Sequence, residues 1–103
     1  MISIIMDEER TKLLDSLHHA GRTTHSIYRQ LKTDGIKGER GCSTSCPIGE
    51  YLISKGHDGP EVHSRHVSVS TDYGDVIVET PVTIKQFIIN FDDGKYLDIV
   101  RKE

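Results

Sequence analysis

The stretch that decides the fold of this chain is residues 66–80, which read HVSVSTDYGDVIVET. Valine alternates with small polar residues on both sides of a central turn, as it does in strands with one buried face. The turn reads DYGD at 72–75 and places glycine where a positive φ is tolerated. The sequence therefore predicts an antiparallel β-hairpin over 66–80.

The pairing of the two strands follows from the turn. We expect Tyr73 and Gly74 to form a two-residue loop. The paired residues are then Thr71 and Val76, Val69 and Val78, and Val67 and Thr80. These six side chains share one face because strand residues alternate in direction. The other face carries Ser68, Ser70, Ile77 and Glu79 and is expected to be wet. An isolated hairpin is marginal in water, so the valine face is expected to pack on a helix.

A helix is predicted at 81–92, directly after the hairpin. We expect Thr80 to cap it and Pro81 to occupy the first turn, where a missing N–H costs nothing. Its apolar residues follow the i, i+3, i+4, i+7 spacing of one helix face: Ile84, Phe87, Ile88 and Phe91. Residues 92–94, Asp-Asp-Gly, are interpreted as a helix end rather than a carboxylate pair. The apolar residues within 96–100 are expected to fold back on the core.

Three more helices are predicted upstream, at 7–20, 24–34 and 46–55. Asp7 with the acidic residues after it is typical of a helix start, because acids favour the positive end of the helix dipole. Gly35 fits the left-handed position that ends a helix, and Ile36 supplies the apolar contact that accompanies such an end. Residues 57–64 are interpreted as a polar loop. Residues 2–5 are apolar, and the sequence leaves open whether they add a strand.

Length and composition indicate a single α+β domain, 1–103, with about four helices and one hairpin. Hydrophobic residues make up 35% and charged residues 28%, and the apolar positions are periodic, which excludes a disordered chain. The net charge of −3 is not typical of a nucleic-acid binder. No stretch approaches the roughly 18 apolar residues of a membrane span, and the start lacks the features of a secretory signal. We therefore expect a cytoplasmic protein with reduced cysteines.

Three short blocks of the sequence form a recognisable combination. They are Gly35-Ile36-Lys37-Gly38, Cys46-Pro47 with Tyr51-Leu52, and Phe87 through Phe91-Asp92 to Gly94 and Tyr96. Together they resemble a group of short uncharacterised proteins of actinobacteria and their phages, over roughly residues 27–98. Gly49 stands where that group would have Ala, and Leu97 stands where it would have Pro. The group has no established activity, so the resemblance implies one coherent domain and transfers no catalytic residue.

Cys42 and Cys46 form a C-x₃-C pair, with His57, His63 and His66 downstream. Thiolates and imidazoles bind zinc, but structural zinc sites usually use other cysteine spacings, so no metal or cofactor is assigned. Cys46 also begins a helix, where the helix dipole lowers the pKa of a thiol and favours the thiolate. Nucleophilic or redox chemistry would need a base as well, and the sequence does not place one beside either thiol.

The segment 22–40 is locally basic. Its charged residues are Arg22, Arg29, Lys32, Lys37 and Arg40 against Asp34 and Glu39, about +3 in net charge. Three helices followed by a hairpin also resemble a winged helix, a DNA-binding variant of the helix-turn-helix. The helix at 46–55, which would read the bases, carries only one lysine and one glutamate. Nucleic-acid binding therefore stays an alternative.

The leading hypothesis is a small, non-catalytic binding or regulatory protein that acts through a protein partner or a small anionic ligand. It rests on a clear core together with the lack of any complete catalytic motif, so no catalytic residue is assigned. The residues expected to contact a ligand are Lys37, Arg40, Cys46 and His66. The alternatives are a nucleic-acid-binding, winged-helix-like domain and a zinc or thiol-redox protein using Cys42 and Cys46. The strand edges and Ile77 also make a homo-oligomer an expectation to test.

Overall fold

A three-stranded antiparallel sheet lies at the centre of the computed structural model, which describes the backbone of residues 2–100 and the side chains of residues 5–100. The strands, in spatial order, are β1 (Asp58–Val62), β2 (His66–Thr71) and β3 (Gly74–Glu79). Within these residues the helices are α1 (Ile2–His19), α2 (Thr24–Thr33), α3 (Pro47–Ser54), α4 (Val82–Asp92) and the short 3₁₀ helix η1 (Leu97–Ile99). The predicted α+β class is confirmed.

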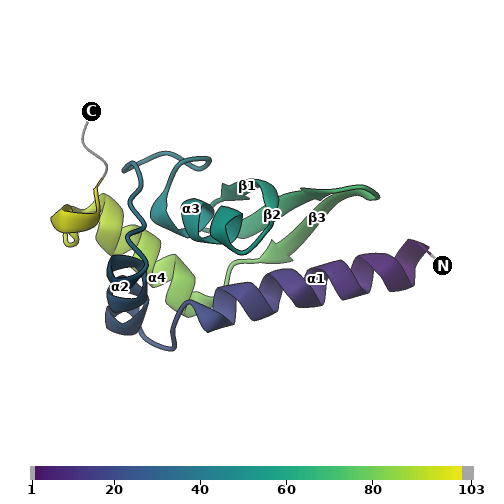
Figure 1. Cartoon of the computed structure of the whole chain (residues 1–103), viewed down its shortest axis with the longest axis horizontal. Coiled ribbons are helices and arrows are strands. Elements are labelled where there is room, and N and C mark those ends of the chain that lie inside the picture. The colour runs from purple at the N-terminus through teal and green to yellow at the C-terminus, as the bar shows by residue number, and fades with distance from the viewer. Residues whose placement is uncertain (1, 101–103) are drawn as a thin grey trace.

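Helices cover one face of the sheet. Figure 1 shows the long helix α1 running beside β3, with α2 and α4 side by side at the end away from the hairpin tip. Helix α3 packs against β1. None of the helices within residues 2–100 combines the length and apolarity needed to span a bilayer.

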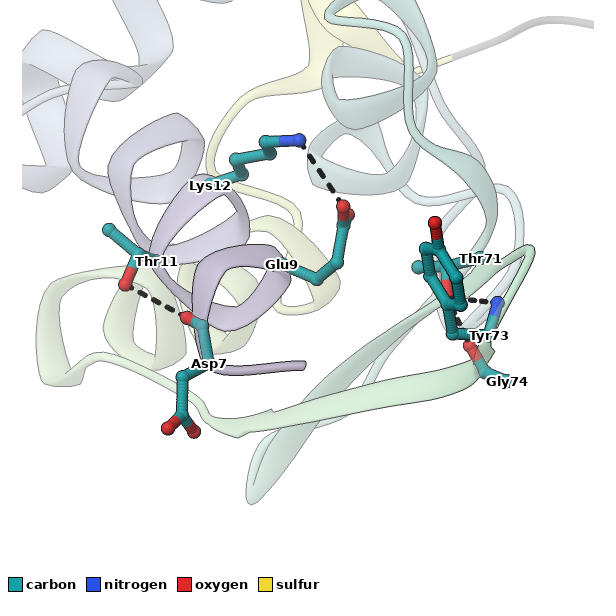
Figure 2. Close-up of polar contacts among 7 residues, drawn as sticks. All are labelled: Asp7, Glu9, Thr11, Lys12, Thr71, Tyr73 and Gly74. Carbon is teal, nitrogen blue, oxygen red and sulfur yellow. Dashed lines mark hydrogen bonds and ion pairs between the residues drawn. The ribbon is translucent and has the colours of Figure 1, made fainter. Parts of the chain in front are cut away.

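The hairpin is confirmed, but its predicted register is wrong by two residues. The observed pairs are Val67 with Val78, Val69 with Val76, and Thr71 with Gly74. The loop is therefore Asp72-Tyr73, and Gly74, with a φ of 117°, follows the loop instead of forming part of it. The hydroxyl of Thr71 accepts a hydrogen bond from the Tyr73 N–H at 3.1 Å and donates to the Gly74 carbonyl at 2.7 Å, which closes the turn (Figure 2). A shift of two residues preserves alternation, so all four strand valines remain buried.

A third strand lies where a polar loop was predicted, within 57–64. Strand β1 pairs with β2 through Asp58 and Ser70, Glu61 and Ser68, and Val62 and Val67, with an irregularity between Asp58 and Glu61. Gly59 has a φ of 53°, and Pro60 has no N–H to donate. Both residues are unusual inside a strand and are tolerated at a sheet edge, which is where β1 lies.

Helix α1 starts at Ile2, so the predicted start at Asp7 is wrong and residues 2–5 are helical. Asp7 instead acts within the helix. Its carboxylate pairs with Arg10 Nη1 at 2.6 Å, and its carbonyl accepts from Thr11 Oγ1 at 3.0 Å (Figure 2 shows the Thr11 contact). The apolar residues before Asp7 contain no helix breaker, so the helix extends through them.

The other predicted helices are confirmed, with one correction to a cap. Helix α2 ends at Thr33. Gly35, just past the Asp34 cap, has a φ of 70°, and the Ile36 N–H donates to the Leu31 carbonyl at 2.9 Å. Helix α4 begins at Val82, with Pro81 rather than Thr80 in the cap position. The Thr80 hydroxyl instead donates to the His63 carbonyl at 2.7 Å, which ties the end of β3 to the loop after β1.

The C-terminal residues return to the core, as predicted, except for Leu97. Tyr96 stacks between Tyr28 and Phe87 at centroid distances of 4.8 and 5.1 Å, and Ile99 is buried. Leu97 is 61% exposed. Gly38 donates to the Ile99 carbonyl at 3.0 Å, so the loop after α2 is held by the C-terminal segment.

Candidate functional site

The four residues predicted to contact a ligand lie in different parts of the surface. Lys37 borders a pocket beside Glu50, and Arg40 is exposed with Nη1 close to Gly94. His66 is exposed on the outer side of the sheet, where its ring packs at 4.7 Å against that of His63. Cys46 is buried at the start of α3. The four residues therefore do not meet in a single pocket.

A pocket of about 220 Å³, which we call the thiol pocket, brings both cysteines together. Its wall contains Cys42, Cys46, His63 and Asp92, from the loop before α3, the loop after β1 and the end of α4. The Asp92 carboxylate accepts from the Gly41 N–H at 2.9 Å and so holds the cysteine loop against α4. The sequence indicated the two cysteines but did not associate Asp92 with them.

The two thiols differ in their surroundings. Burial, with smaller contributions from the nearby Asp92 and Cys42, raises the pKa of Cys46 to about 11. The prediction of a thiolate at this helix start is therefore wrong, because desolvation outweighs the hydrogen bond that Cys46 Sγ accepts from Gly49 at 3.4 Å. Cys42 is partly exposed, and hydrogen bonds from Thr44 and then Ser45 lower the pKa of its thiol.

Metal binding at the thiol pocket has no support from the geometry. Within residues 2–100, no three side chains among His, Cys, Asp and Glu are grouped so that they could hold a metal ion. His57, one of the histidines considered with the cysteines, lies in a different pocket. Of the downstream histidines, only His63 lines the thiol pocket.

A second pocket, of about 560 Å³, lies between α1 and the end of α3, and we call it the α1–α3 pocket. It is lined by Glu9, Lys12, Asp15, Ser16, His19, Tyr51, Lys55, Gly56 and His57. Ser16 Oγ and His57 Nε2 lie 2.9 Å apart and form a partly buried hydrogen bond across 41 residues of sequence. No local spacing connects these two residues, so only the packing of α1 on α3 reveals the pair.

The charges of the α1–α3 pocket are unevenly partnered. Lys12 pairs with Glu9 at 3.2 Å, as Figure 2 shows. Lys55 Nζ lies 5.3 Å from the centre of the Tyr51 ring and forms no ion pair with any of the described residues. Burial lowers the pKa of His57 below its usual value; Glu9 raises it and Lys12 lowers it by smaller amounts, and the net shift favours the neutral imidazole. Lys55 is thus the cation left for an incoming anion.

A neighbouring pocket of about 530 Å³ shares His19 with the α1–α3 pocket. Its wall includes His18 and Arg22, and at the start of α4 it includes Pro81, Thr83 and Ile84. It is lined by basic and neutral residues only. Two pockets with basic groups therefore flank the end of α1.

Helix α3 does not present the surface of a DNA-reading helix. Five of its eight residues are buried, and its exposed residues are Ile53 and Ser54. The hairpin, which would form the wing, carries exposed carboxylates at Asp72, Asp75 and Glu79. These would face phosphate unfavourably, so the geometry disfavours the nucleic-acid alternative.

No family model matches this chain, and no curated protein or solved structure matches it either. The candidate sites therefore rest on the chemistry of this chain's own residues.

Proposed function

We propose that this protein is a small, non-catalytic regulatory protein that binds a small carboxylate-bearing molecule in the α1–α3 pocket. The observation that carries the proposal is the group of hydrogen-bonding side chains around Lys55. Its ammonium has no carboxylate partner among the described residues, and the Ser16–His57 pair lines the same pocket. A charge-assisted hydrogen bond from Lys55 to a carboxylate would be among the stronger polar contacts available there.

The remaining charges limit the ligand to a low net charge. Glu9 and Asp15 line the same pocket and would repel a multiply charged anion. Asp15 is exposed, and its backbone carbonyl already accepts from His19 Nδ1 at 2.7 Å. The side-chain carboxylate of Asp15 is available to an amino group on the ligand. A monocarboxylate or an amino-acid-like zwitterion therefore fits better than a phosphate.

The Ser16–His57 hydrogen bond favours one alternative, acyl transfer, in which Ser16 would be the nucleophile and His57 the base. Such chemistry also needs donors for the developing oxyanion. The backbone N–H groups beside His57 are already engaged, since Gly56 donates to Ile53 at 3.0 Å and His57 donates to Leu52 at 3.0 Å. Binding without turnover is the better-supported function.

The experiment is a titration of ¹⁵N-labelled full-length protein with acetate, glycine and inorganic phosphate, followed by amide chemical shifts. We expect acetate or glycine to move the signals of Lys55 to His57 more than phosphate does. The Lys55→Gln variant should bind the ligand about tenfold more weakly, because it loses one charge-assisted hydrogen bond. Lys85→Gln, which removes an exposed lysine from α4, should bind normally.

Two outcomes would contradict the proposal. If Arg22→Gln weakens binding and Lys55→Gln does not, the ligand occupies the neighbouring pocket. If the protein hydrolyses p-nitrophenyl acetate and Ser16→Ala abolishes the turnover, the protein is an enzyme.

A further inference from the structure

We propose that Cys42 and Cys46 form a thiol pair sensitive to hydroperoxides, in which Cys42 is the site of oxidation and Cys46 then closes an intramolecular disulfide. This inference concerns the thiol pocket and is independent of any ligand in the α1–α3 pocket. It assigns a modification site with a substrate class, a hydroperoxide, to a part of the molecule that the proposed function does not use.

The loop that carries the cysteines is held in place at several points. Ser45 accepts from the Glu39 N–H at 2.8 Å, and Ser43 accepts from the Val62 N–H at 2.8 Å, both through their carbonyls. The Gly41 N–H donates to Asp92 at 2.9 Å. The loop is thus anchored both to the neighbouring strand β1 and to helix α4. Both thiols consequently line the same small pocket of about 220 Å³.

The surroundings of the two thiols decide which one is oxidised first. Cys42 is partly exposed, and Cys42 Sγ lies 3.4 Å from Thr44 Oγ1. Hydroxyl and backbone donors of Thr44 and Ser45 favour its thiolate, which is the form that attacks a peroxide. Cys46 is 5% exposed, so a peroxide reaches it poorly. Its raised pKa also keeps it in the less reactive thiol form. Accessibility and ionisation therefore both select Cys42 as the first sulfur to react.

The chemistry balances as two steps that pass two electrons to the peroxide. The Cys42 thiolate attacks the terminal oxygen of a hydroperoxide, the O–O bond breaks, and an alkoxide leaves and takes up a proton from water. Cys42 becomes a sulfenic acid. The Cys46 sulfur then attacks the Cys42 sulfur and loses its proton, the S–O bond breaks, and water leaves as the disulfide forms.

Oxidation would also alter helix α3. In the reduced protein Cys46 Sγ accepts from the Gly49 N–H and caps the helix. A sulfur bonded to Cys42 is drawn away from that position. The Gly49 amide hydrogen should then exchange faster with solvent, which gives the modification a structural signature separate from mass.

The test treats reduced full-length protein with increasing hydrogen peroxide in the presence of a chelator and maps the products by mass spectrometry. Trypsin cleaves after Arg40 and Lys55, so one peptide, residues 41–55, contains both cysteines. We expect this peptide to lose the mass of two hydrogen atoms and to resist thiol alkylation until a reductant is added. Gly49 amide exchange should accelerate in the same samples.

Variants separate the two roles. In Cys46→Ser, which keeps a good capping residue, dimedone should trap a sulfenic acid on Cys42. In Cys42→Ser, Cys46 should oxidise at least about tenfold more slowly, since little of it is thiolate. Thr44→Val, which removes a donor from an exposed position, should slow oxidation of Cys42 without altering the fold.

Three results would overturn the inference. They are a peptide 41–55 that keeps two free thiols after oxidation, disulfides that link two chains instead of Cys42 to Cys46, and equal oxidation rates in Cys42→Ser and the wild type. None of these results bears on the binding of acetate or glycine at Lys55, so the two proposals fail separately.

Discussion

The phenol of Tyr28 donates a 2.5 Å hydrogen bond to the carboxylate of Asp98, 70 residues further along the chain. Lys32 Nζ reaches the same carboxylate at 3.0 Å and the Tyr28 oxygen at 3.4 Å. Tyr28 and Lys32 belong to α2 and Asp98 to η1, so the contact fastens the C-terminal segment to the second helix. Tyr96 stacks on the Tyr28 ring and so adds an aromatic contact between the same two segments.

Asp98→Asn should lower the melting temperature at pH 7, by a small amount because Lys32 and Asp98 are exposed. Hydrogen bonding from Tyr28, followed by that from Lys32, holds the pKa of Asp98 below its usual value. A lowered carboxyl pKa stabilises the fold above the unfolded-state pKa, and that stabilisation is lost as pH falls through the folded-state pKa. The difference between variant and wild type should therefore be full above about pH 5 and vanish on acidification.

Thermal unfolding from pH 2 to 8 checks this prediction. Glu61→Gln, which removes an exposed carboxylate from β1, is the matched control and should not reproduce the pH dependence. A difference between Asp98→Asn and the wild type that persists unchanged at the lowest pH would mean that packing of η1, and not this carboxylate, is affected.

Local patterns predicted the helices and the buried face of the hairpin, because these depend only on spacing along the chain. The register depended on a detail of the turn, since the Thr71 hydroxyl stabilises a loop of Asp72-Tyr73. Strand β1 is irregular at Gly59 and Pro60, so alternation does not mark it, and its pairing with β2 is what makes it a strand.

Thr80→Val should lower the free energy of unfolding by about 1–2 kcal/mol, because it leaves the His63 carbonyl without the hydroxyl that donates to it in a partly buried hydrogen bond of 2.7 Å. Thr80 is 7% exposed, so water would replace that hydroxyl poorly. Urea unfolding measures the change. Thr80→Ser keeps the donor and should lose less. A Ser variant as unstable as the Val variant would mean that side-chain packing at this position matters as much as the hydrogen bond.

The candidate sites were less accessible to sequence reasoning than the fold. Cys42 and Cys46 are close in sequence and were recognisable as a pair, but which thiol ionises more readily depends on burial, and the helix-dipole argument selected the wrong one. Ser16 and His57 are joined only through the packing of α1 on α3. Lys37 and Arg40 share a basic segment without sharing a pocket with Cys46.

Val67→Ala and Ile77→Ala test the two faces of the sheet with one pair of variants. Val67 is fully buried, and its truncation should cost roughly 2 kcal/mol through lost burial and a residual cavity. Ile77 is 57% exposed, so Ile77→Ala should lower the free energy of unfolding by less than about 0.5 kcal/mol. Urea unfolding distinguishes them, and sedimentation of both proteins tests for self-association. A large loss for Ile77→Ala that depends on protein concentration would show that Ile77 is covered in an oligomer.

The raised pKa of Cys46 predicts a loss of stability in alkali. The folded-state pKa of about 11 lies above the usual 9.0, so the folded protein keeps a proton that the unfolded chain releases between these values. Stability is then full below pH 9.0 and falls by about 1.4 kcal/mol per pH unit as pH rises toward the folded-state pKa, up to roughly 2–3 kcal/mol. Urea unfolding under reducing conditions at pH 8, 9, 10 and 11 measures the slope. Cys46→Ser should lose most of it, whereas Cys42→Ser should keep it, because the partly exposed Cys42 has a lowered pKa. A slope equal in the Cys46→Ser variant and the wild type would mean that another group, and not the buried thiol, releases the proton.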